Sequence, residues 1–253
     1  MAGMTDDLFR QDAYLRECSA HITAVTDAGI VLDRTVFYPL GGGQAGDSGV
    51  LVLADGTEIA IADTRKGKDA EGNATNNIVH IPAPGQEALL AALAPGTTVT
   101  ARIDWERRHR MMRLHTTSHL LCHVVPQLVN GCSITPDYAR LDFAMTDPLD
   151  KEQLTAAIAA MVAAAHPLTV ASISDEELDA NPALVKSMSV QPPRGTGRIR
   201  TIRIGGEGDA PLIDLQPCGG THVANTAEIG AIVVTKIEKK SATTRRVVLG
   251  FVP

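Results

Sequence analysis

Two pairs of metal-binding residue types, about a hundred residues apart, constrain the fold of this chain more than any other feature. In HTTSH, His115 and His119 are four residues apart within a run whose apolar positions recur at helical spacing. In CGGTH, Cys218 and His222 are also four apart, with two glycines between them. Side chains four apart share one face of a helix, and two glycines permit a tight turn that brings Cys218 and His222 together. A shared metal would tie a long helix to the edge of the final sheet.

The types of ligand favour one particular metal. A thiolate with three imidazoles suits tetrahedral Zn²⁺, and the wide separation of the two pairs excludes a zinc finger. Threonine at position 116 removes the glutamate that an HExxH metalloprotease needs, and the PCxxC motif of the zinc deaminases is absent. We therefore predict one Zn²⁺ ion held by His115, His119, Cys218 and His222. The alternative is a set of ordinary core histidines.

We predict structural roles for one further histidine of the HTTSH helix and for the three cysteines outside the proposed ligand set. His123 continues the i, i+4 series, and with four ligands available we expect it to be packed or to support the site. Cys18, Cys122 and Cys132 are expected to be small buried side chains rather than ligands.

Composition limits the class of protein and the kind of partner. The 253 residues are 44% hydrophobic and carry a formal net charge of −6, which argues against binding a polyanion through the whole surface. Basic clusters at 105–113, 194–203 and 236–246 are nevertheless candidates for contacts with a phosphate backbone. With 3% aromatic residues there is little material for base stacking, so such contacts should be to phosphate and sugar.

The compartment is predicted from the N-terminus, the apolar segments and the cysteines. MAGMTDDLFRQD does not resemble a secretory signal, and the most apolar stretch, LTAAIAAMVAAAH, is too short to span a bilayer. Four cysteines are too few for a disulfide scaffold. We expect a cytoplasmic protein with no membrane partner.

The first part of the chain, residues 1–97, is predicted to be a small β-barrel-like domain. Hairpins are expected at Asp55–Gly56 and near Asp27–Gly29, a polar loop over 66–77, and a further strand at NIVHIPA. Many short strands with glycine turns favour a barrel or a sandwich.

The second part, residues 98–253, is predicted to be a two-layer α+β domain, which makes the whole chain α+β. The pattern indicates a helix over 105–129 capped by Asp104, a strand at Leu141–Ala144, and a helix from KEQL that ends before Pro167. In that helix Leu154, Ile158, Met161 and Ala165 are expected to share one face. A short helix with a capping box of Ser174 and Glu177 follows, and the end of the chain is rich in strands.

The loop FYPLGGGQAGDSG, residues 37–49, contains a formal GxGxxG pattern at Gly41, Gly43 and Gly46. A dinucleotide fingerprint should open a helix, whereas a strand-like segment, SGVLVLAD, follows here. The loop is therefore either a tight β connection or a backbone that approaches a small ligand, with Gln44 as a fixed polar side chain.

Four segments together resemble a known family. FYPLGGGQAGDSG, RMMRLHTTSHLL, DLQPCGGTHVANTAEIG and KIEKKSATTRR occur in the order found in the editing region of alanyl-tRNA synthetase. They resemble still more closely the freestanding AlaX-type alanyl-tRNA editing proteins of the middle-sized class. In these proteins a β-domain with the glycine motif precedes the zinc-binding editing domain.

The resemblance implies a hydrolase that deacylates mischarged tRNA(Ala) in trans, chiefly Ser-tRNA(Ala) and also Gly-tRNA(Ala), with zinc as cofactor and the acceptor end of tRNA(Ala) as partner. The chemistry is consistent, because an apolar pocket cannot strongly reject a residue that is smaller than alanine or that only adds a hydroxyl. Two alternatives stay open: editing of Ser-tRNA(Thr), since threonyl-tRNA synthetase carries a related domain, and a zinc-stabilised tRNA-binding module without catalysis.

Candidate site residues follow from the motifs. By the family pattern the zinc ligands are His115, His119, Cys218 and His222, and the loop with Gly41, Gly42, Gly43 and Gln44 flanks the pocket. Polar side chains near the motifs are the candidates for catalysis and for recognising the serine hydroxyl: Gln44, Thr116 and Thr117 for catalysis, and Gln44, Ser133 and Thr135 for substrate binding. Replacing Gln44 is expected to slow seryl-ester hydrolysis more than it lowers zinc content.

The role of the metal and the identity of the base stay open. Zinc can activate water, polarise the ester carbonyl or anchor the tRNA 3′ end, and a full set of four protein ligands favours anchoring or ligand exchange. Neither HTTSH nor CGGTH contains an acidic residue that would act as a base.

Overall fold

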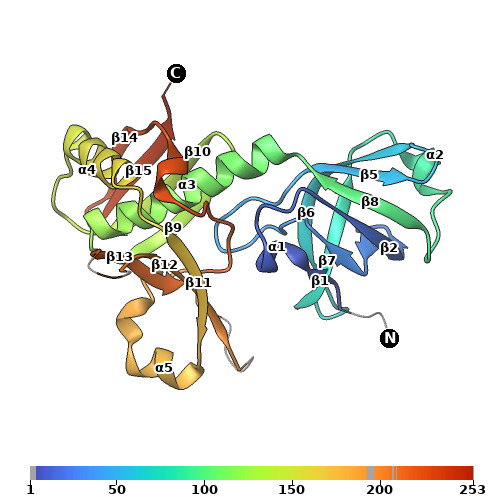
Figure 1. Cartoon of the computed structure of the whole chain (residues 1–253), viewed down its shortest axis with the longest axis horizontal. Helices are drawn as coiled ribbons and strands as arrows, with labels where there is room; N and C mark the ends of the chain where they lie inside the picture. Colours follow the sequence, from blue (N-terminus) through green and yellow to red (C-terminus); the bar gives the residue numbers. More distant parts are fainter. Residues whose placement is uncertain (1–3, 193–196, 207, 209, 253) are drawn as a thin grey trace. The chain divides into compact units, whose positions relative to one another are not determined.

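The computed structural model describes residues 4–192, 197–206, 208 and 210–252. The chain forms two compact units, the first made of Met1–Gly41 and Ala45–Arg108 and the second of Gly42–Gln44 and His109–Pro253. Helices and strands are mixed in the chain as a whole, which confirms the predicted α+β class (Figure 1).

The first unit is built mainly from strands, and six of them close into a barrel. Its elements are β1 (Asp6–Asp7), α1 (Leu8–Gln11), β2 (Glu17–Thr26), β3 (Gly29–Leu32), β4 (Arg34–Thr35), β5 (Gly49–Leu53), β6 (Glu58–Lys68), β7 (Ala74–Pro82), α2 (Glu87–Leu90) and β8 (Thr98–Ile103). The barrel order is β2-β3-β7-β6-β5-β8, and β1 pairs in parallel with β4 outside it.

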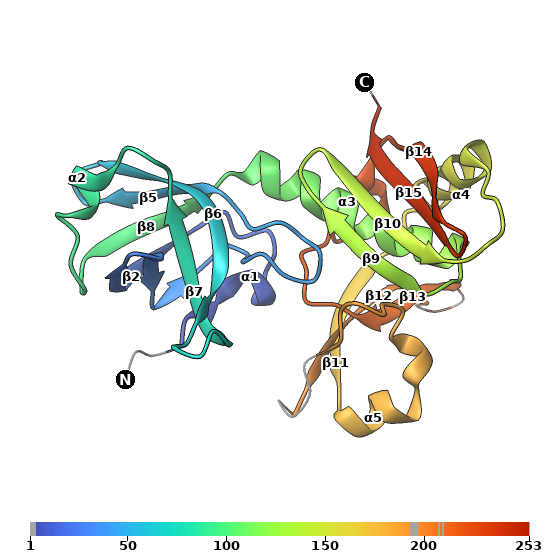
Figure 2. The same cartoon turned by 180° about the vertical axis from the view of Figure 1, so that it is seen from behind.

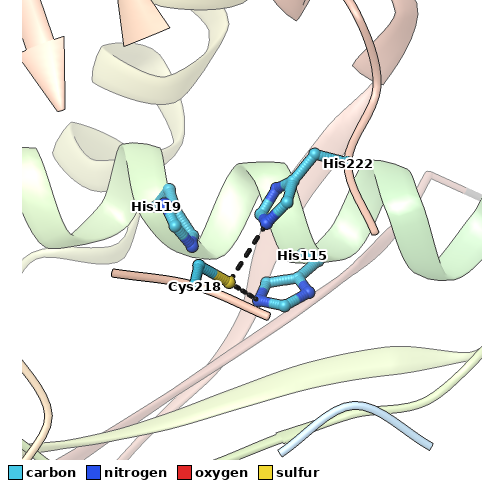
Figure 3. Close-up of side chains that lie close together, drawn as sticks. All are labelled: His115, His119, Cys218 and His222. Atoms are coloured by element: carbon cyan, nitrogen blue, oxygen red, sulfur yellow. Dashed lines mark hydrogen bonds between the residues drawn. The ribbon is translucent and has the colours of Figure 1, made fainter. Parts of the chain in front are cut away.

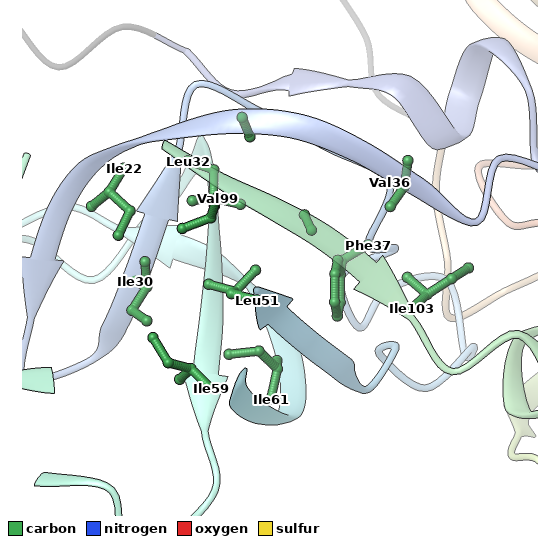
Figure 4. Packing of buried hydrophobic residues seen from close by; sticks show 12 residues of the cluster. Ile22, Ile30, Leu32, Val36, Phe37, Leu51, Ile59, Ile61, Val99 and Ile103 are labelled. Carbon is green, nitrogen blue, oxygen red and sulfur yellow. The ribbon is translucent and has the colours of Figure 1, made fainter. Parts of the chain in front are cut away.

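The barrel core follows from alternation along the strands. In β6, Ile59 and Ile61 are buried and their neighbours Glu58 and Ala60 are exposed, because successive side chains of a strand point to opposite faces. Leu51 of β5 and Phe37 join them in an apolar cluster that fills the barrel (Figure 4). Filling by side chains is the normal interior of a barrel of this size.

Two predicted hairpins of the barrel are confirmed, and one loop is shorter than predicted. β5 and β6 turn at Asp55–Gly56, and β2 and β3 turn before Gly29. Gly29 has φ +136°, and a Cβ there would lie 2.4 Å from the carbonyl oxygen of His80, so only glycine fits. The polar loop expected over 66–77 is wrong in extent, because β6 and β7 pair through most of it and leave only 69–73 between them.

The second unit contains two antiparallel sheets and the longest helix. Its elements are α3 (Trp105–Val124, from His109 on), β9 (Val129–Ile134), β10 (Tyr138–Ala144), α4 (Lys151–Ala163), β11 (Leu168–Ile173), α5 (Asp175–Ala180), η1 (Pro182–Leu184), β12 (Ile199–Gly205), β13 (Leu212–Pro217), η2 (Thr226–Ile229), β14 (Ile232–Ser241) and β15 (Thr244–Phe251). One sheet has the order β14-β15-β10-β9 and the other β11-β12-β13. Helices α3 and α4 cover one face of the four-stranded sheet, and the opposite face is seen in Figure 2.

Individual residues near the ends of α3 and α5 determine where these helices begin or end. The Asp104 carboxylate accepts the backbone N–H of Arg107, as expected of a cap, but α3 ends at Val124 and not at residue 129, because Pro126 cannot continue a helix. The capping box of Ser174 and Glu177 on α5 is confirmed.

The predicted apolar face of α4 is correct only in its first half. Leu154 and Ile158 are buried, whereas Met161 is half-buried. Ala165 lies beyond the end of α4, is exposed and has a positive φ of 54°. The helix therefore ends at Ala163, two residues before the last position of the predicted apolar face.

Within the described ranges, none of the helices combines the length and the apolar character required to cross a membrane.

Candidate metal centre

Four side chains converge in the second unit. His115 and His119 project from one face of α3, Cys218 follows the edge strand β13, and His222 lies in the segment after it (Figure 3). Their potential ligand atoms all lie within 4.8 Å of one another. The three histidines are buried, with 5–6% exposure, and Cys218 is half-buried.

The distances fit a tetrahedral ion of the size of zinc. Cys218 Sγ lies 3.5 Å from His115 Nε2 and 3.3 Å from His222 Nε2, the two contacts dashed in Figure 3. With Zn–S of about 2.3 Å and Zn–N of about 2.0–2.1 Å, a tetrahedral site separates sulfur from nitrogen by about 3.6 Å. The donor types of the four residues and these two spacings are therefore suitable for a metal ion such as Zn²⁺.

Each histidine is held through its other ring nitrogen. His115 Nδ1 donates to Gln44 Oε1 at 2.8 Å, and His119 Nδ1 donates to Asp214 Oδ2 at 2.8 Å. His222 Nδ1 lies 3.1 Å from Thr116 Oγ1. An acceptor at Nδ1 fixes the tautomer in which Nε2 carries the free lone pair, which is the form that binds a metal.

Gln44 reaches this centre from residues 42–44, the short segment of the glycine loop that belongs to the second unit. The Gly43 carbonyl accepts the N–H of Ile134 at 2.8 Å, and Gln44 forms a β-bridge with Ile134. The Gln44 side chain is fully buried, and its amide also bonds the backbone N–H and hydroxyl of Thr221, at 3.0 and 2.8 Å. These contacts support the metal centre and leave no exposed surface on Gln44.

Glycine is required at two positions because neighbouring atoms lie too close to leave room for a side chain. A Cβ on Gly220 would lie 2.1 Å from the His115 ring, and one on Gly43, whose φ is +85°, would lie 2.3 Å from Cys132 Sγ. Real Cβ contacts are never this short. Each glycine therefore permits packing that any larger residue would displace.

Asp214 is a buried carboxylate that the sequence reasoning missed. Besides His119 it binds Gln216 Nε2 at 2.7 Å and forms an ion pair with Lys186. Burial raises the pKa of Asp214, but His119 and Lys186 outweigh it and lower the pKa to about 2. The signal was present in PLIDLQPCGGTH, where an acid interrupts an apolar strand four residues before Cys218.

Arg200 was also missed as a supporting residue. Its Nη1 donates to the carbonyl oxygens of Cys218 and Gly220, at 2.6 and 3.1 Å. It therefore holds the backbone of the CGGTH segment in place. In the sequence Arg200 belongs to the basic segment 194–203, of which residues 194–196 lie outside the described residues.

The electrostatics favour the ligand form of Cys218, whereas His119 would have to release a proton on binding a metal. Burial raises the pKa of the Cys218 thiol, but His115 and His222 outweigh this and hold the pKa well below its ordinary value. Burial lowers the pKa of His119, yet Asp214 and Cys218 raise it to about 9. A thiol that loses its proton readily is a good metal ligand.

The other polar candidates lie in different surroundings. Thr116 and Thr117 are fully buried; the Thr116 hydroxyl contacts His222, and the Thr117 hydroxyl donates to the Arg113 carbonyl one turn back. The Thr135 hydroxyl donates to the Tyr138 carbonyl in the turn between β9 and β10. Ser133 is half-buried on β9.

The pairing register of β9 with β10 places the side chains of Ser133 and Cys132 on opposite faces of the sheet. Cys132 pairs with the buried Leu141, and Ser133 pairs with Arg140 on the other face of the sheet. Cys132 is thus the side chain on the face that α3 covers, and its thiol lies 3.7 Å from the Gly42 carbonyl oxygen.

Predictions for the remaining residues need correction. His123 is exposed and forms no hydrogen bond or ion pair with a described residue, so it is neither packed nor a support of the site. Each i+4 step advances about 40° around a helix, so two steps turn His123 about 80° away from His115. Cys122 is buried as predicted, but Cys18 and Cys132 are only half-buried. Gly42 is exposed with φ +58°, and the Gly41 carbonyl, in the first unit, accepts the Tyr38 hydroxyl at 2.8 Å.

Sequence comparison relates both parts of the chain to aminoacyl-tRNA synthetases. Residues 199–248 match the family described as the threonyl and alanyl tRNA synthetase second additional domain, and this segment includes Cys218 and His222. Residues 10–107 match the family of class II (A) tRNA synthetases.

Individual relatives extend over nearly the whole chain. Alanyl-tRNA editing protein AlaX-M of Saccharolobus solfataricus is 33% identical over 249 residues, covering 96% of this chain and 98% of that protein. AlaX-M of Methanosarcina acetivorans is 32% identical, with 96% and 97% covered. An alanine–tRNA ligase of Hyperthermus butylicus is 34% identical over 93% of this chain, but only 24% of the ligase is covered. The chain therefore belongs to the family of the AlaX-M alanyl-tRNA editing proteins.

Proposed function

We propose that this protein is a trans-editing hydrolase that deacylates mischarged tRNA(Ala), chiefly Ser-tRNA(Ala), with Gly-tRNA(Ala) as a second substrate. The observation that carries the proposal is the preorganised centre of three histidines and Cys218, in a chain of the size and family of AlaX-M proteins. Its partner is the acceptor end of tRNA(Ala) carrying a wrong amino acid.

The proposed cofactor is one Zn²⁺ ion held by His115, His119, Cys218 and His222. Zinc held by these residues would supply a positive charge that can polarise the ester or anchor the tRNA 3′ end. Donor types, the spacings of 3.3 and 3.5 Å and the fixed tautomers support this assignment.

The roles proposed for the protein's own residues differ in kind. Gln44 and Thr116 orient His115 and His222, and so act on the ester only through those ligands. Thr117 is bonded to its own helix and supports the backbone of α3. Recognition of the serine hydroxyl by the 133–135 segment stays a prediction; if it is correct, removing those hydroxyls reduces the preference for serine over alanine.

A second candidate function is the removal of serine from tRNA(Thr). It is favoured by one observation, the match of residues 199–248 to a domain shared by threonyl and alanyl tRNA synthetases. The match of nearly the whole chain to alanyl-tRNA editing proteins favours the alanine pathway over it.

Deacylation of four substrates side by side tests these proposals: Ser-tRNA(Ala), Gly-tRNA(Ala), Ala-tRNA(Ala) and Ser-tRNA(Thr). Each is measured with the intact protein and with Cys218→Ala. We expect rapid loss of serine from tRNA(Ala), slower loss of glycine, alanine retained, and an inactive variant. Loss of serine from tRNA(Thr) alone would move the protein to the threonine pathway. A metal-loaded protein that binds tRNA(Ala) without hydrolysing any ester would be a binding module.

A further inference from the structure

Two arginines of α3 lie against one aromatic ring at the end of β15. The guanidinium carbons of Arg110 and Arg113 lie 4.1 and 4.5 Å from the centroid of the Phe251 ring. Residues three apart on a helix are surface neighbours, so the spacing brings both cations to the same ring. Cation–π contacts of this kind hold a guanidinium plane in a defined orientation.

The backbone fixes each guanidinium further. Arg110 Nε donates to the Pro136 carbonyl and Arg113 Nε to the Ile229 carbonyl, both at 2.7 Å. Neither arginine donates from an Nη atom to any hydrogen-bond acceptor among the described residues. Both guanidinium groups are thus held in a defined orientation, and their Nη–H donors are available to a ligand.

The positive charge of this pair is poorly compensated within the protein. The nearest carboxylate of Arg110 is Asp137 at 3.9 Å, whose side chain is 84% exposed, and no carboxylate of a described residue pairs with Arg113. Two like charges are therefore held side by side at a cost that an anion would relieve.

In the other two basic segments, the arginines that the structure describes bind groups within the protein. Arg246 forms a two-point contact with Asp142, at 2.7 and 2.8 Å, and Arg200 binds the CGGTH backbone. Arg203 donates to the Gly206 carbonyl at 2.6 Å. Among the described residues, Arg110 and Arg113 differ from them in that no Nη atom of either guanidinium donates to an internal acceptor.

We propose that Arg110, Arg113 and Phe251 form a clamp for a phosphodiester group in the acceptor stem of the tRNA. The proposal rests on the proposed function and names a contact by which this chain would hold its partner. Guanidinium forks match phosphate oxygens in geometry and charge. Arg110 precedes His115 by five residues, which separates them by about 7.5 Å along the axis of α3 and by about 140° around it, so the clamp would hold a phosphate of the stem and not one beside the ester.

The test compares a whole tRNA with an ester that has no stem. The double variant Arg110→Gln/Arg113→Gln is assayed on Ser-tRNA(Ala) and on 3′-seryl-adenosine, at salt concentrations from 50 to 200 mM. We expect the ratio of the two kcat/KM values, tRNA over adenosine ester, to fall about tenfold or more at low salt. The slope of log kcat/KM for tRNA against log salt should become shallower by about 1, as expected for the loss of one phosphate contact.

A matched control replaces an arginine whose charge is already paired. Arg65→Gln removes a guanidinium that lies 2.8 Å from Asp63, and we expect it to leave the ratio and the slope unchanged. An unchanged slope in the double variant, with a lowered melting temperature, would overturn the clamp and leave the arginines as anchors of Phe251. Equal losses on both esters would also overturn it.

A binding measurement separates this proposal from the proposed function. Equilibrium binding of uncharged tRNA(Ala) is followed by fluorescence anisotropy for the same three proteins. If the intact protein binds tRNA with a steep salt dependence that the double variant loses, the clamp stands even where no ester is hydrolysed. If binding by the double variant equals that by the intact protein, the clamp is wrong whatever the protein hydrolyses.

Discussion

At the scale of single residues, Asp214 connects His119 to the interior of the second unit through Lys186 and Gln216. In Asp214→Asn the amide can present N–H to His119 Nδ1, which favours the tautomer that cannot bind metal through Nε2. We predict a zinc affinity about 10- to 100-fold lower, measured by competition with a chromophoric chelator.

As a control, Asp142→Asn removes a carboxylate paired with Arg246 and should leave zinc affinity unchanged. Equal affinities in all three proteins would contradict the role given to Asp214.

Gln44 gives a second prediction at this scale. The sequence alone favours a larger loss of hydrolysis than of zinc, whereas the bonds of Gln44 to His115 and Thr221 favour a joint loss. We predict that Gln44→Ala lowers zinc affinity and Ser-tRNA(Ala) hydrolysis together, and that Gln44→Glu, which keeps the acceptor, retains most of the zinc affinity. Full zinc affinity in Gln44→Ala with slow hydrolysis would instead support direct contact with the substrate.

His80 gives a prediction about pH. It is fully buried in the first unit, between the Ile30 carbonyl at 3.0 Å and the Thr35 hydroxyl at 2.8 Å, and burial lowers its pKa from 6.5 to about 4. Because the folded state binds the proton less readily, the stability from His80 is complete above pH 6.5 and is lost as the pH falls towards 4, by about 3 kcal/mol.

Hydrogen exchange of amides in β3 and β7 at pH 7 and pH 4 measures this loss. In His80→Gln the contribution of His80 to the pH dependence should be absent, although the variant will be less stable at pH 7. The same pH dependence in the variant and the intact protein would refute the assignment.

At the scale of elements, the glycine loop is secured to the start of α3 by one buried ion pair. Arg108 and Asp47 are each no more than 1% exposed, and Arg108 also donates to the carbonyls of Ala13 and Val36, at 2.9 and 2.7 Å. Removing one partner leaves an unpaired buried charge, so we predict that Arg108→Met destabilises the first unit by about 3–5 kcal/mol.

Denaturant unfolding followed by the fluorescence of Trp105, the one tryptophan of the chain, reports on this unit. The double variant Arg108→Met/Asp47→Asn should recover part of the loss, because the unpaired charge is also removed. A single variant as stable as the intact protein would contradict the prediction.

The elements also show how far sequence reasoning reaches. Strands and hairpins were predictable because alternation and Asp–Gly turns are local, and His115 and His119 could be paired because i, i+4 spacing fixes their face. Helix α3 was predicted too long because the apolar spacing continues past Pro126, where the backbone cannot.

Contacts that depend on pairing between distant segments were not predictable. Whether Cys132 or Ser133 faces α3 depends on the register of β9 against β10, since a shift of one residue exchanges the faces. Asp214 could be noticed as an acid within an apolar strand, but its partner and those of Arg200 could not be assigned, because they are distant in sequence and only the fold brings them together. The division at residue 97 stays a prediction, and the barrel includes β8 beyond it.

At the scale of the whole molecule, a net charge of −6 requires that an RNA partner be held at defined places and not by the general field of the protein. The metal centre and the proposed Arg110–Arg113 clamp are both in the second unit, so we propose that ester chemistry and phosphate recognition belong to the same unit. The proposed function requires above all that editing depend on a metal held by His115, His119, Cys218 and His222.

The most direct measurement is the rate of Ser-tRNA(Ala) deacylation as a function of zinc content, after chelation and stepwise return of the metal. We predict a rate that rises in proportion to zinc up to one ion per chain and then stays constant, with Ala-tRNA(Ala) spared throughout. In Cys218→Ala the same titration should give no comparable rise. A rate independent of zinc content, or no hydrolysis with the site fully loaded, would contradict the account.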